Sequence, residues 1–115
     1  MKKIKTVYLA GKITGDPGYA DKFRAAKERL EQPQHDFIVL SPAILPLEGF
    51  DYGAYMRMSS AMLSECDAVC FLPDWRESPG AKVEMKQAVK QGKAIFFYDE
   101  WAEEQNWLYD EGGTQ

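Results

Sequence analysis

The sequence predicts an α/β fold, a small doubly wound parallel sheet of four to five strands in the order 2-1-3-4 with helices on both faces. Short apolar segments alternate with longer amphipathic ones, which gives the element order β-α-β-α-β-α-β. The short segments are apolar at almost every position, a pattern typical of strands that are covered on both sides. The 115 residues suffice for one hydrophobic core but not for a separate substrate domain.

The first strand and helix are separated by a loop rich in glycine. Residues 4–10 are an apolar run, and the segment 11–18 ends it with three glycines and a proline. Apolar residues then recur every three or four positions from 19 to 31, which predicts a helix. Its inward side chains are expected to be Ala20, Phe23, Ala26 and Leu30.

The next strand and helix are separated by a longer loop. Residues 37–40 form a second apolar run closed by Ser41-Pro42, and prolines and glycine punctuate the loop that follows. Asp51 has the side chain to cap a helix that extends to Glu65. The core positions expected on this helix are Tyr55, Met58, Met62 and Leu63.

The last two strands enclose a third helix. Residues 67–73 and 94–98 are apolar strands, and Ser78 is expected to cap a helix that Pro79 opens and Gln91 ends. One face of this helix would bury Ala81, Met85, Ala88, Val89 and Gly92. Residues 1–98 therefore form the expected domain.

Residues 99–115 form an acidic and aromatic tail. They contain six acidic residues and no basic one, together with Trp101, Trp107 and Tyr109. The tail is expected either to pack on the same domain or to contact another copy, because aromatic residues favour interfaces. A one-domain protein that needs a second lobe must take it from another subunit, so we expect a homo-oligomer.

The charge distribution narrows the range of partners. The net charge is −4, but residues 1–98 carry 14 basic and 12 acidic side chains, a mildly basic body that suits a small anionic ligand. The sequence has no basic stripe of the kind that binds polymeric nucleic acid, so we expect no such partner. No apolar run approaches the ~20 residues of a membrane span and no signal sequence is apparent, so we expect no membrane partner and a cytoplasmic location.

Cys66 and Cys70 predict core thiols instead of a disulfide or a metal site. They lie at the same parity of one strand, about 13 Å apart at ~3.3 Å per residue, which is too far for a bond between them. The only histidine, His35, falls in an expected turn, so we expect no bound metal.

Glu84 is the candidate for chemistry. Ligands of doubly wound sheets bind beyond the carboxyl ends of the strands, where the loops around Gly11, Ser41-Pro42 and 74–80 would meet. Glu84 lies near this edge, on the border of the buried stripe of its helix. A surface glutamate that complements the helix dipole is the simpler interpretation, but Glu84 lies beyond the first turn and has no cation three or four residues away. A carboxylate in this position is typical of a catalytic acid or nucleophile.

Two other features at this edge have a structural explanation as well as a functional one. The loop from Gly11 can hold a phosphate or sugar through its backbone amides, or it can be a plain tight connection. Ser78 can donate to a phosphate or a ribose hydroxyl, or it can serve only as a helix cap.

Four segments carry a resemblance to a known family. They are Val7-Tyr8-Leu9-Ala10-Gly11 with Thr14-Gly15, Cys66-Asp67-Ala68-Val69, Leu72-Pro73-Asp74-Trp75, and Ser78-Pro79-Gly80-Ala81 with Glu84. With them the chain resembles, over nearly its whole length, the nucleoside 2-deoxyribosyltransferase-like superfamily, and in particular its branch known as domain of unknown function 4406.

The resemblance implies catalytic roles for Glu84 and Tyr8. The superfamily's glutamate at the position of Glu84 is the nucleophile at the anomeric carbon of the sugar, and Tyr8 would position it. Gly11, Ser78 and Gly80 would bind the substrate, with Ser78 placed as in the branch that hydrolyses nucleoside 5′-monophosphates.

The resemblance also marks one departure. Relatives usually carry an aspartate at the position of Ser59, which is expected to face inward and bind the substrate. A hydroxyl cannot act as the same general acid, whose loss typically costs ~10²–10⁴-fold in rate. Asp74 is the candidate to replace part of that function.

The sequence thus predicts a nucleoside or nucleotide N-glycosidase or N-deoxyribosyltransferase-like protein that needs no metal and no organic cofactor. One alternative is a non-catalytic nucleotide-binding or sensing module of the same fold. Another is a small interaction protein that assembles through its aromatic tail.

Overall fold

The computed structural model describes the backbone of residues 3–113 and the side chains of residues 3–106. Four parallel strands form one sheet in the order β2-β1-β3-β4, as the sequence predicts. Their bounds are Thr6–Ala10 (β1), Ile38–Leu40 (β2), Ala68–Phe71 (β3) and Ala94–Phe97 (β4). Because the winding reverses between β1 and β3, the loops after these strands border the position where such sheets bind ligands.

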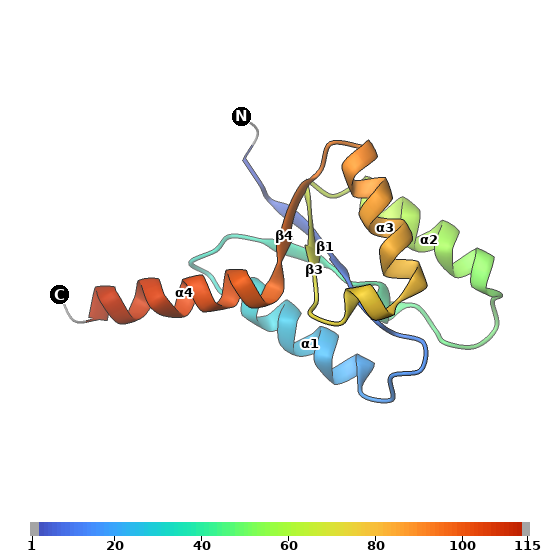
Figure 1. Cartoon of the computed structure of the whole chain (residues 1–115), viewed down its shortest axis with the longest axis horizontal. Helices are drawn as coiled ribbons and strands as arrows, with labels where there is room; N and C mark the ends of the chain where they lie inside the picture. The colour runs from blue at the N-terminus through green and yellow to red at the C-terminus, as the bar shows by residue number, and fades with distance from the viewer. Residues whose placement is uncertain (1–2, 114–115) are drawn as a thin grey trace.

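Helices cover both faces of the sheet, as Figure 1 shows. One face carries α1 (Tyr19–Leu30) and α4 (Tyr98–Gly113), and the other carries α2 (Tyr52–Ser64) and α3 (Pro79–Lys90). Two short 3-10 helices, η1 (Pro42–Ile44) and η2 (Trp75–Glu77), follow β2 and β3. Side chains of β1 alternate between the two faces, so Val7 and Leu9 pack towards α1 while Tyr8 and Ala10 face α2 and α3.

Both predicted helix caps are confirmed. The Ser78 Oγ accepts a hydrogen bond from the Ala81 backbone N at 3.1 Å, with Pro79 as the first helical residue of α3. The Asp51 Oδ1 accepts one from the Ala54 N at 2.7 Å at the start of α2. These local bonds satisfy amides that the first turn of a helix leaves free.

The buried face of α3 is rotated from the predicted one. Glu84 is only 6% exposed and shares the buried face with Ala81 and Ala88, whereas Val89, expected in the core, is 64% exposed. The reason is that α3 packs on α2 as well as on the sheet, and the Gln87 Nε2 donates to the Ser60 backbone O at 3.0 Å. Contact with α2 therefore turns Glu84 inwards and leaves Val89 in solvent.

Two smaller expectations for buried residues are also wrong. Ala20 is exposed because it lies in the first turn of α1, beyond the edge of the core that Phe23, Ala26 and Leu30 fill. Gly92 is exposed in the turn after α3, where its φ of +68° is a conformation that favours glycine.

The cysteines are buried and free, as predicted. Within the described residues, no set of three or more His, Cys, Asp or Glu side chains is grouped so that it could hold a metal ion. None of the helices in the described part of the chain is long and apolar enough to cross a membrane.

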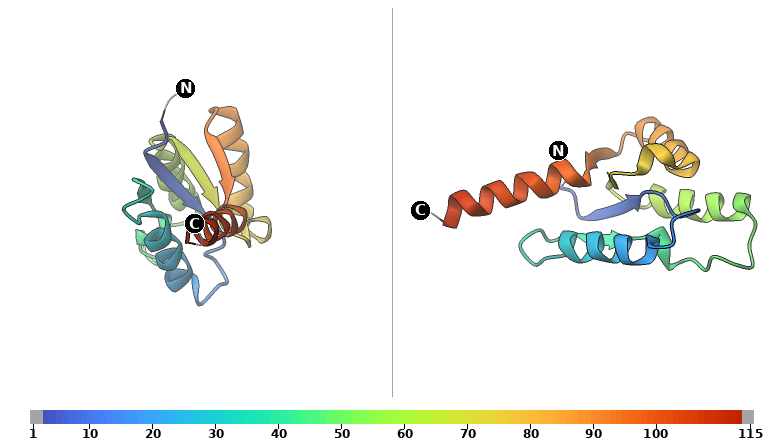
Figure 2. Two further views of the ribbon diagram at one scale, coloured as in Figure 1. Left: turned by 90° about the vertical axis from the view of Figure 1, so that its left-hand side faces the viewer. Right: turned by 60° about the horizontal axis from the view of Figure 1, so that its bottom comes forward.

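Helix α4 begins directly after β4 and runs away from the rest of the molecule (Figures 1 and 2). Its first turns are anchored by Trp101, whose ring lies 4.9 Å from that of His35 and also packs on Phe96. The Arg29 guanidinium of α1 donates to the Asn106 Oδ1. From these contacts we propose that the start of α4 belongs to the same domain as residues 1–98. The side chains of Trp107 and Tyr109 lie outside the described residues, and a contact of the tail with another copy stays a prediction.

The contacts of Trp101 predict a measurable role in stability. Replacing Trp101 with Ala should lower the free energy of unfolding by about 1–3 kcal/mol, because a half-buried aromatic ring loses its packing partners. Urea denaturation at constant m-value measures this. Glu104→Ala, at an exposed position on the same helix, is the matched control and should change stability by less than about 0.5 kcal/mol. Equal stability of the two variants would show that α4 is not part of the folded domain.

Candidate active site

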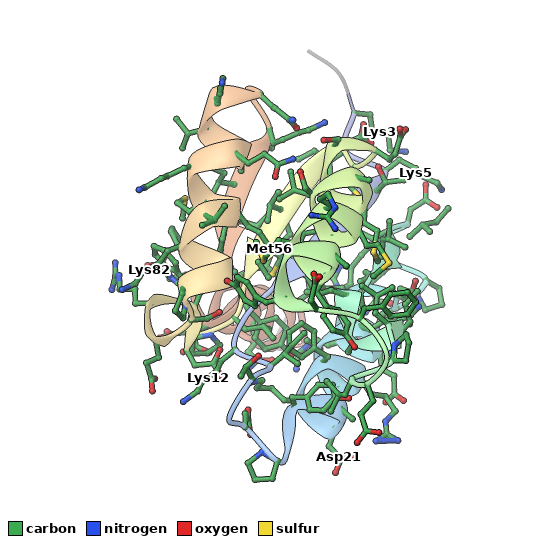
Figure 3. The ribbon with its side chains drawn as sticks, turned by 90° about the vertical axis from the view of Figure 1, so that its right-hand side faces the viewer. Lys3, Lys5, Lys12, Asp21, Met56 and Lys82 are labelled. Atoms are coloured by element: carbon green, nitrogen blue, oxygen red, sulfur yellow. The ribbon has the colours of Figure 1, made fainter. Side chains whose placement is uncertain are left out.

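A pocket of about 390 Å³ opens at the carboxyl edge of the sheet. Residues from all three loops expected there line it, namely Gly11 after β1, Pro42 after β2 and Ser78 after β3. The first half of α2 completes the wall, and Figure 3, which looks onto this side of the molecule, labels Met56 between α2 and α3. The volume lies within the range of about 300–1,000 Å³ typical of small-molecule sites.

Tyr8 and Glu84 meet at this pocket, and both line it. The Tyr8 hydroxyl donates a hydrogen bond to the Glu84 Oε2. Tyr8 is fully buried because it lies in β1, which is hydrogen-bonded to β2 and β3, and its side chain points to the α2–α3 face. Glu84 reaches it from the second turn of α3, so two elements 76 residues apart in sequence define one contact.

Burial dominates the electrostatics of this pair. It raises the pKa of Glu84 from 4.5 to about 7, even though hydrogen bonding with Tyr8 and Ser59 favours the ionised form. Burial and the neighbouring Glu84 carboxylate raise the pKa of Tyr8 well above 10, so Tyr8 keeps its proton and acts as a donor. The pKa of Glu84 therefore lies near neutral pH, so both its protonated and its ionised forms are accessible there.

Ser59 is the third buried polar side chain of this cluster, and it faces inward from α2 as predicted. Its Oγ donates to the backbone O of Tyr55 at 2.9 Å, one helical turn earlier. The hydroxyl also lowers the pKa values of both Tyr8 and Glu84 by hydrogen bonding. Ser59 thus lies beside the Tyr8–Glu84 pair, and its hydroxyl can donate its one proton either to the α2 backbone or to the ionised carboxylate.

The two site glycines allow close approach of neighbouring groups. A Cβ on Gly11 would lie 2.9 Å from the Leu72 Cδ1 and 3.2 Å from the Asp74 Oδ1. A larger residue would therefore push apart the loops that follow β1 and β3. A Cβ on Gly80 would lie 3.3 Å from the Met56 Sδ, on the side where α3 faces α2. Both glycines line the pocket.

Asp74 is placed differently from the other expected site residues, because it is not among those that line the pocket. Its Oδ1 accepts from the Lys12 backbone N at 3.0 Å, and its Oδ2 accepts from the Lys22 Nζ at 2.5 Å. The same Lys22 ammonium donates to Asp16 and to the Lys12 backbone O. Asp74 therefore joins the glycine loop to the start of η2 by hydrogen bonds, and its side chain does not face the pocket.

The sequence did not identify the aromatic wall of the pocket, formed by Tyr19, Tyr52 and Tyr55. Tyr55 is at helical spacing with Met62 and Leu63, which made it a core prediction. The hydroxyl of Tyr55 is buried and has no hydrogen-bond partner among the described residues. The signal that could have separated Tyr55 from a core residue is its place in the first turns of a helix that follows a loop. There the hydroxyl of a tyrosine needs a hydrogen-bond partner that an apolar core does not supply.

Two further properties of the pocket affect which ligands suit it. Its outer rim is apolar and exposed, with Leu47 at 56% and Tyr52 at 58% exposure. No lysine or arginine is found among the described residues that line the pocket, although the body of the chain is mildly basic. The charged lining residues are Glu77 and Glu84.

The fold and the site define a doubly wound α/β protein with a buried carboxylate in a pocket at its switch point. The chain belongs to the family described as domain of unknown function (DUF4406), whose model matches residues 5–97. Among solved structures, the "2-desoxiribosyltransferase from Leishmania mexicana" is similar, with a TM-score of 0.64 and 18% sequence identity. The alignment covers 81% of this chain and 63% of that one, and at this identity the likeness shows the fold. No protein in the curated set matches the sequence.

Burial of Glu84 predicts an unusual dependence of stability on pH. The pKa of Glu84 is about 7 in the folded state and near 4.5 when unfolded, so the folded state binds the proton more tightly. This contribution to stability is full below pH 4.5 and is lost as the pH rises through 7, a loss of about 3 kcal/mol. Glu84→Gln, which stays neutral, should therefore be more stable than the natural chain at pH 8 and similar to it at pH 4.5. Chemical denaturation across this range measures the difference, and parallel curves for the two proteins would contradict the assignment.

Proposed function

We propose that the protein transfers or hydrolyses the N-glycosidic bond of a nucleoside or nucleotide, with Glu84 as the nucleophile. The observation that carries the proposal is the buried contact between Tyr8 and Glu84 in the pocket at the carboxyl edge of the sheet. Membership of the family and the likeness of the fold to a 2-desoxiribosyltransferase are consistent with it. Its substrate would be a small molecule held by the pocket, and no metal or organic cofactor is needed for displacement by a carboxylate.

The first step would be attack by Glu84 on the anomeric carbon. The Tyr8 hydroxyl bonds Oε2, so we assign Oε1 as the attacking oxygen. Oε1 forms a bond to the anomeric carbon while the bond from that carbon to the base nitrogen breaks and its electron pair leaves with the base. The product is a glycosyl ester of Glu84 within the pocket.

The second step would release the sugar. Water or an acceptor base attacks the anomeric carbon and gives its proton to the departed base or to solvent, and Glu84 leaves as a carboxylate that the Tyr8 hydrogen bond stabilises. Two displacements at one carbon retain its configuration. Ser78 at the start of α3 and the loop from Gly11 would hold the sugar or a phosphate on it, because both line the pocket there.

A non-catalytic nucleotide-binding module of the same fold is the second candidate. It is favoured by Ser59, which stands beside Glu84 where a second carboxylate would support catalysis. Such a module would bind the same ligands without turnover, and its ligand-induced thermal stabilisation would survive Glu84→Gln.

Base release from a panel of nucleosides and their 5′-monophosphates, with and without an acceptor base, tests the proposed reaction. Glu84→Gln should lower the rate by ~10⁴-fold or more, as loss of a nucleophile does. Tyr8→Phe should lower it by up to ~10²-fold, since the carboxylate loses its orienting bond. Glu28→Gln, on the exposed side of α1, is the matched control. Activity that persists unchanged in Glu84→Gln would disprove the role of the carboxylate.

The pH dependence of the same reaction gives a further check. Only the ionised form of Glu84 is a nucleophile, and its pKa is about 7 in the folded protein. The rate constant kcat/KM should therefore rise with pH on a limb centred near 7 and level off above it. A flat profile between pH 5 and 8 would argue against attack by Glu84.

A further inference from the structure

The pocket lacks an obvious source of the proton that a departing base usually needs. A neutral nucleobase is a poor leaving group, and glycoside-cleaving sites normally pair a nucleophilic carboxylate with a second carboxylic acid that protonates the leaving atom. Among the described residues, Glu84 is the only buried carboxylate. A site of this kind has a nucleophile but no buried acid.

Three other buried hydroxyls belong to the site, and two of them, those of Ser59 and Tyr8, already donate hydrogen bonds within it. The proton of Ser59 goes to the backbone O of Tyr55 at 2.9 Å, with the Met56 O at 3.4 Å as a second acceptor. The proton of Tyr8 goes to the Glu84 carboxylate. Releasing either proton to a leaving base would break the bond that orders the site.

The remaining titratable groups of the lining are poorly suited to the task. The Glu77 side chain is 67% exposed, and its Oε1 lies 3.9 Å from the Lys12 Nζ, so it is solvated at the mouth of the pocket. The Tyr55 hydroxyl has no partner within the part of the chain that the structure describes, but burial raises its pKa, which makes this phenol a weaker acid than usual. Tyr52 is 58% exposed at the rim of the pocket.

The same lining is complementary to a positive charge. The described residues that line the pocket include no cationic side chain, and their two carboxylates are Glu77 and Glu84. Glu77 pairs with Lys12 at the mouth, so the negative charge inside the pocket is that of Glu84, and it favours a cation. The wall of three tyrosines offers aromatic faces, against which cationic rings bind more strongly than neutral ones. Two independent features, the missing acid and the acidic aromatic lining, therefore indicate one kind of ligand.

We propose that the substrate is a cationic N-glycoside, a nucleoside or nucleotide whose base carries a positive charge on the nitrogen bonded to the sugar or within the same ring system. Pyridinium ribosides and N7-alkylated purine nucleosides are of this class. The proposal rests on the function proposed above and specifies its substrate. Glu84 forms the bond to the anomeric carbon, the electron pair of the broken bond neutralises the cationic ring, and the base leaves without taking up a proton. Water then attacks the anomeric carbon and gives its proton to solvent as Glu84 is released.

Guanosine and 7-methylguanosine, in ribose and 2′-deoxyribose forms, make a matched pair of substrates for the test, with nicotinamide riboside as a second cationic probe. The natural chain should release the cationic bases with a kcat/KM at least ~10²-fold above that for guanosine, since the missing acid is worth that much to the neutral substrate. Release of all of them should depend on Glu84. Guanosine cleaved within tenfold of 7-methylguanosine in a Glu84-dependent way would overturn the cationic-substrate proposal and leave the reaction type standing. No base release from any substrate would overturn both.

Ser59→Asp provides a second test of the missing acid, because it places a carboxyl group beside the reacting pair. The ratio of guanosine to 7-methylguanosine cleavage should rise by ~10-fold or more in this variant. Ser59→Asn, which matches Asp in size and cannot donate as an acid, is the control and should keep the natural ratio. A ratio that rises equally in both variants would show that pocket shape sets the preference, contrary to the proposal. Circular dichroism and thermal melting establish that each variant is folded, and the unmodified chain alone decides the question if Ser59→Asp does not fold.

Discussion

A single desolvated carboxylate constrains most of this small domain. Glu84 is held inside the protein by the hydroxyl of Tyr8, and that bond requires a fully buried central strand on one side and a helix rotated inwards on the other. Tyr8 can act as a fixed hydrogen-bond donor to Glu84 because β1 is hydrogen-bonded to a strand on each side. Packing of α3 on α2 supplies the rotation that brings Glu84 to the same place. The hydrophobic core and the candidate chemistry therefore depend on the same contacts.

A second set of interactions holds the glycine loop in position around this carboxylate. Lys22 on α1 bonds Asp16, Asp74 and the backbone O of Lys12, which joins the loops after β1 and β3 across the edge of the sheet. The carboxylates and the ammonium are partly buried, so their mutual pairing is worth more than an exposed ion pair. Lys22, Asp16 and Asp74 are not among the residues that line the pocket, whose lining contains carboxylates and tyrosines.

Local signals were readable from the sequence, and features set by packing between distant elements were not. The caps at Asp51 and Ser78 and the strand order depend on near neighbours or on general rules of parallel sheets. The depth of Glu84 depends on the contact of α3 with α2, which places a polar residue where hydrophobicity alone selects Val89. The partner of Asp74 is a lysine 52 residues away. The same face of α2 contacts the core near Leu63 and lines the pocket near the start of the helix. Helical spacing alone therefore places Tyr55 in the core.

The two halves of the pocket differ in how freely they can change in evolution. Its floor is built from β1 and the buried face of α3, where almost any substitution disturbs the core. Its rim, which includes Leu47 and Tyr52, consists of exposed side chains whose replacement has little effect on folding. Mutations at the rim can therefore alter which molecules enter while the reacting groups are inherited unchanged. A lineage built on this architecture could diversify its ligands through one loop.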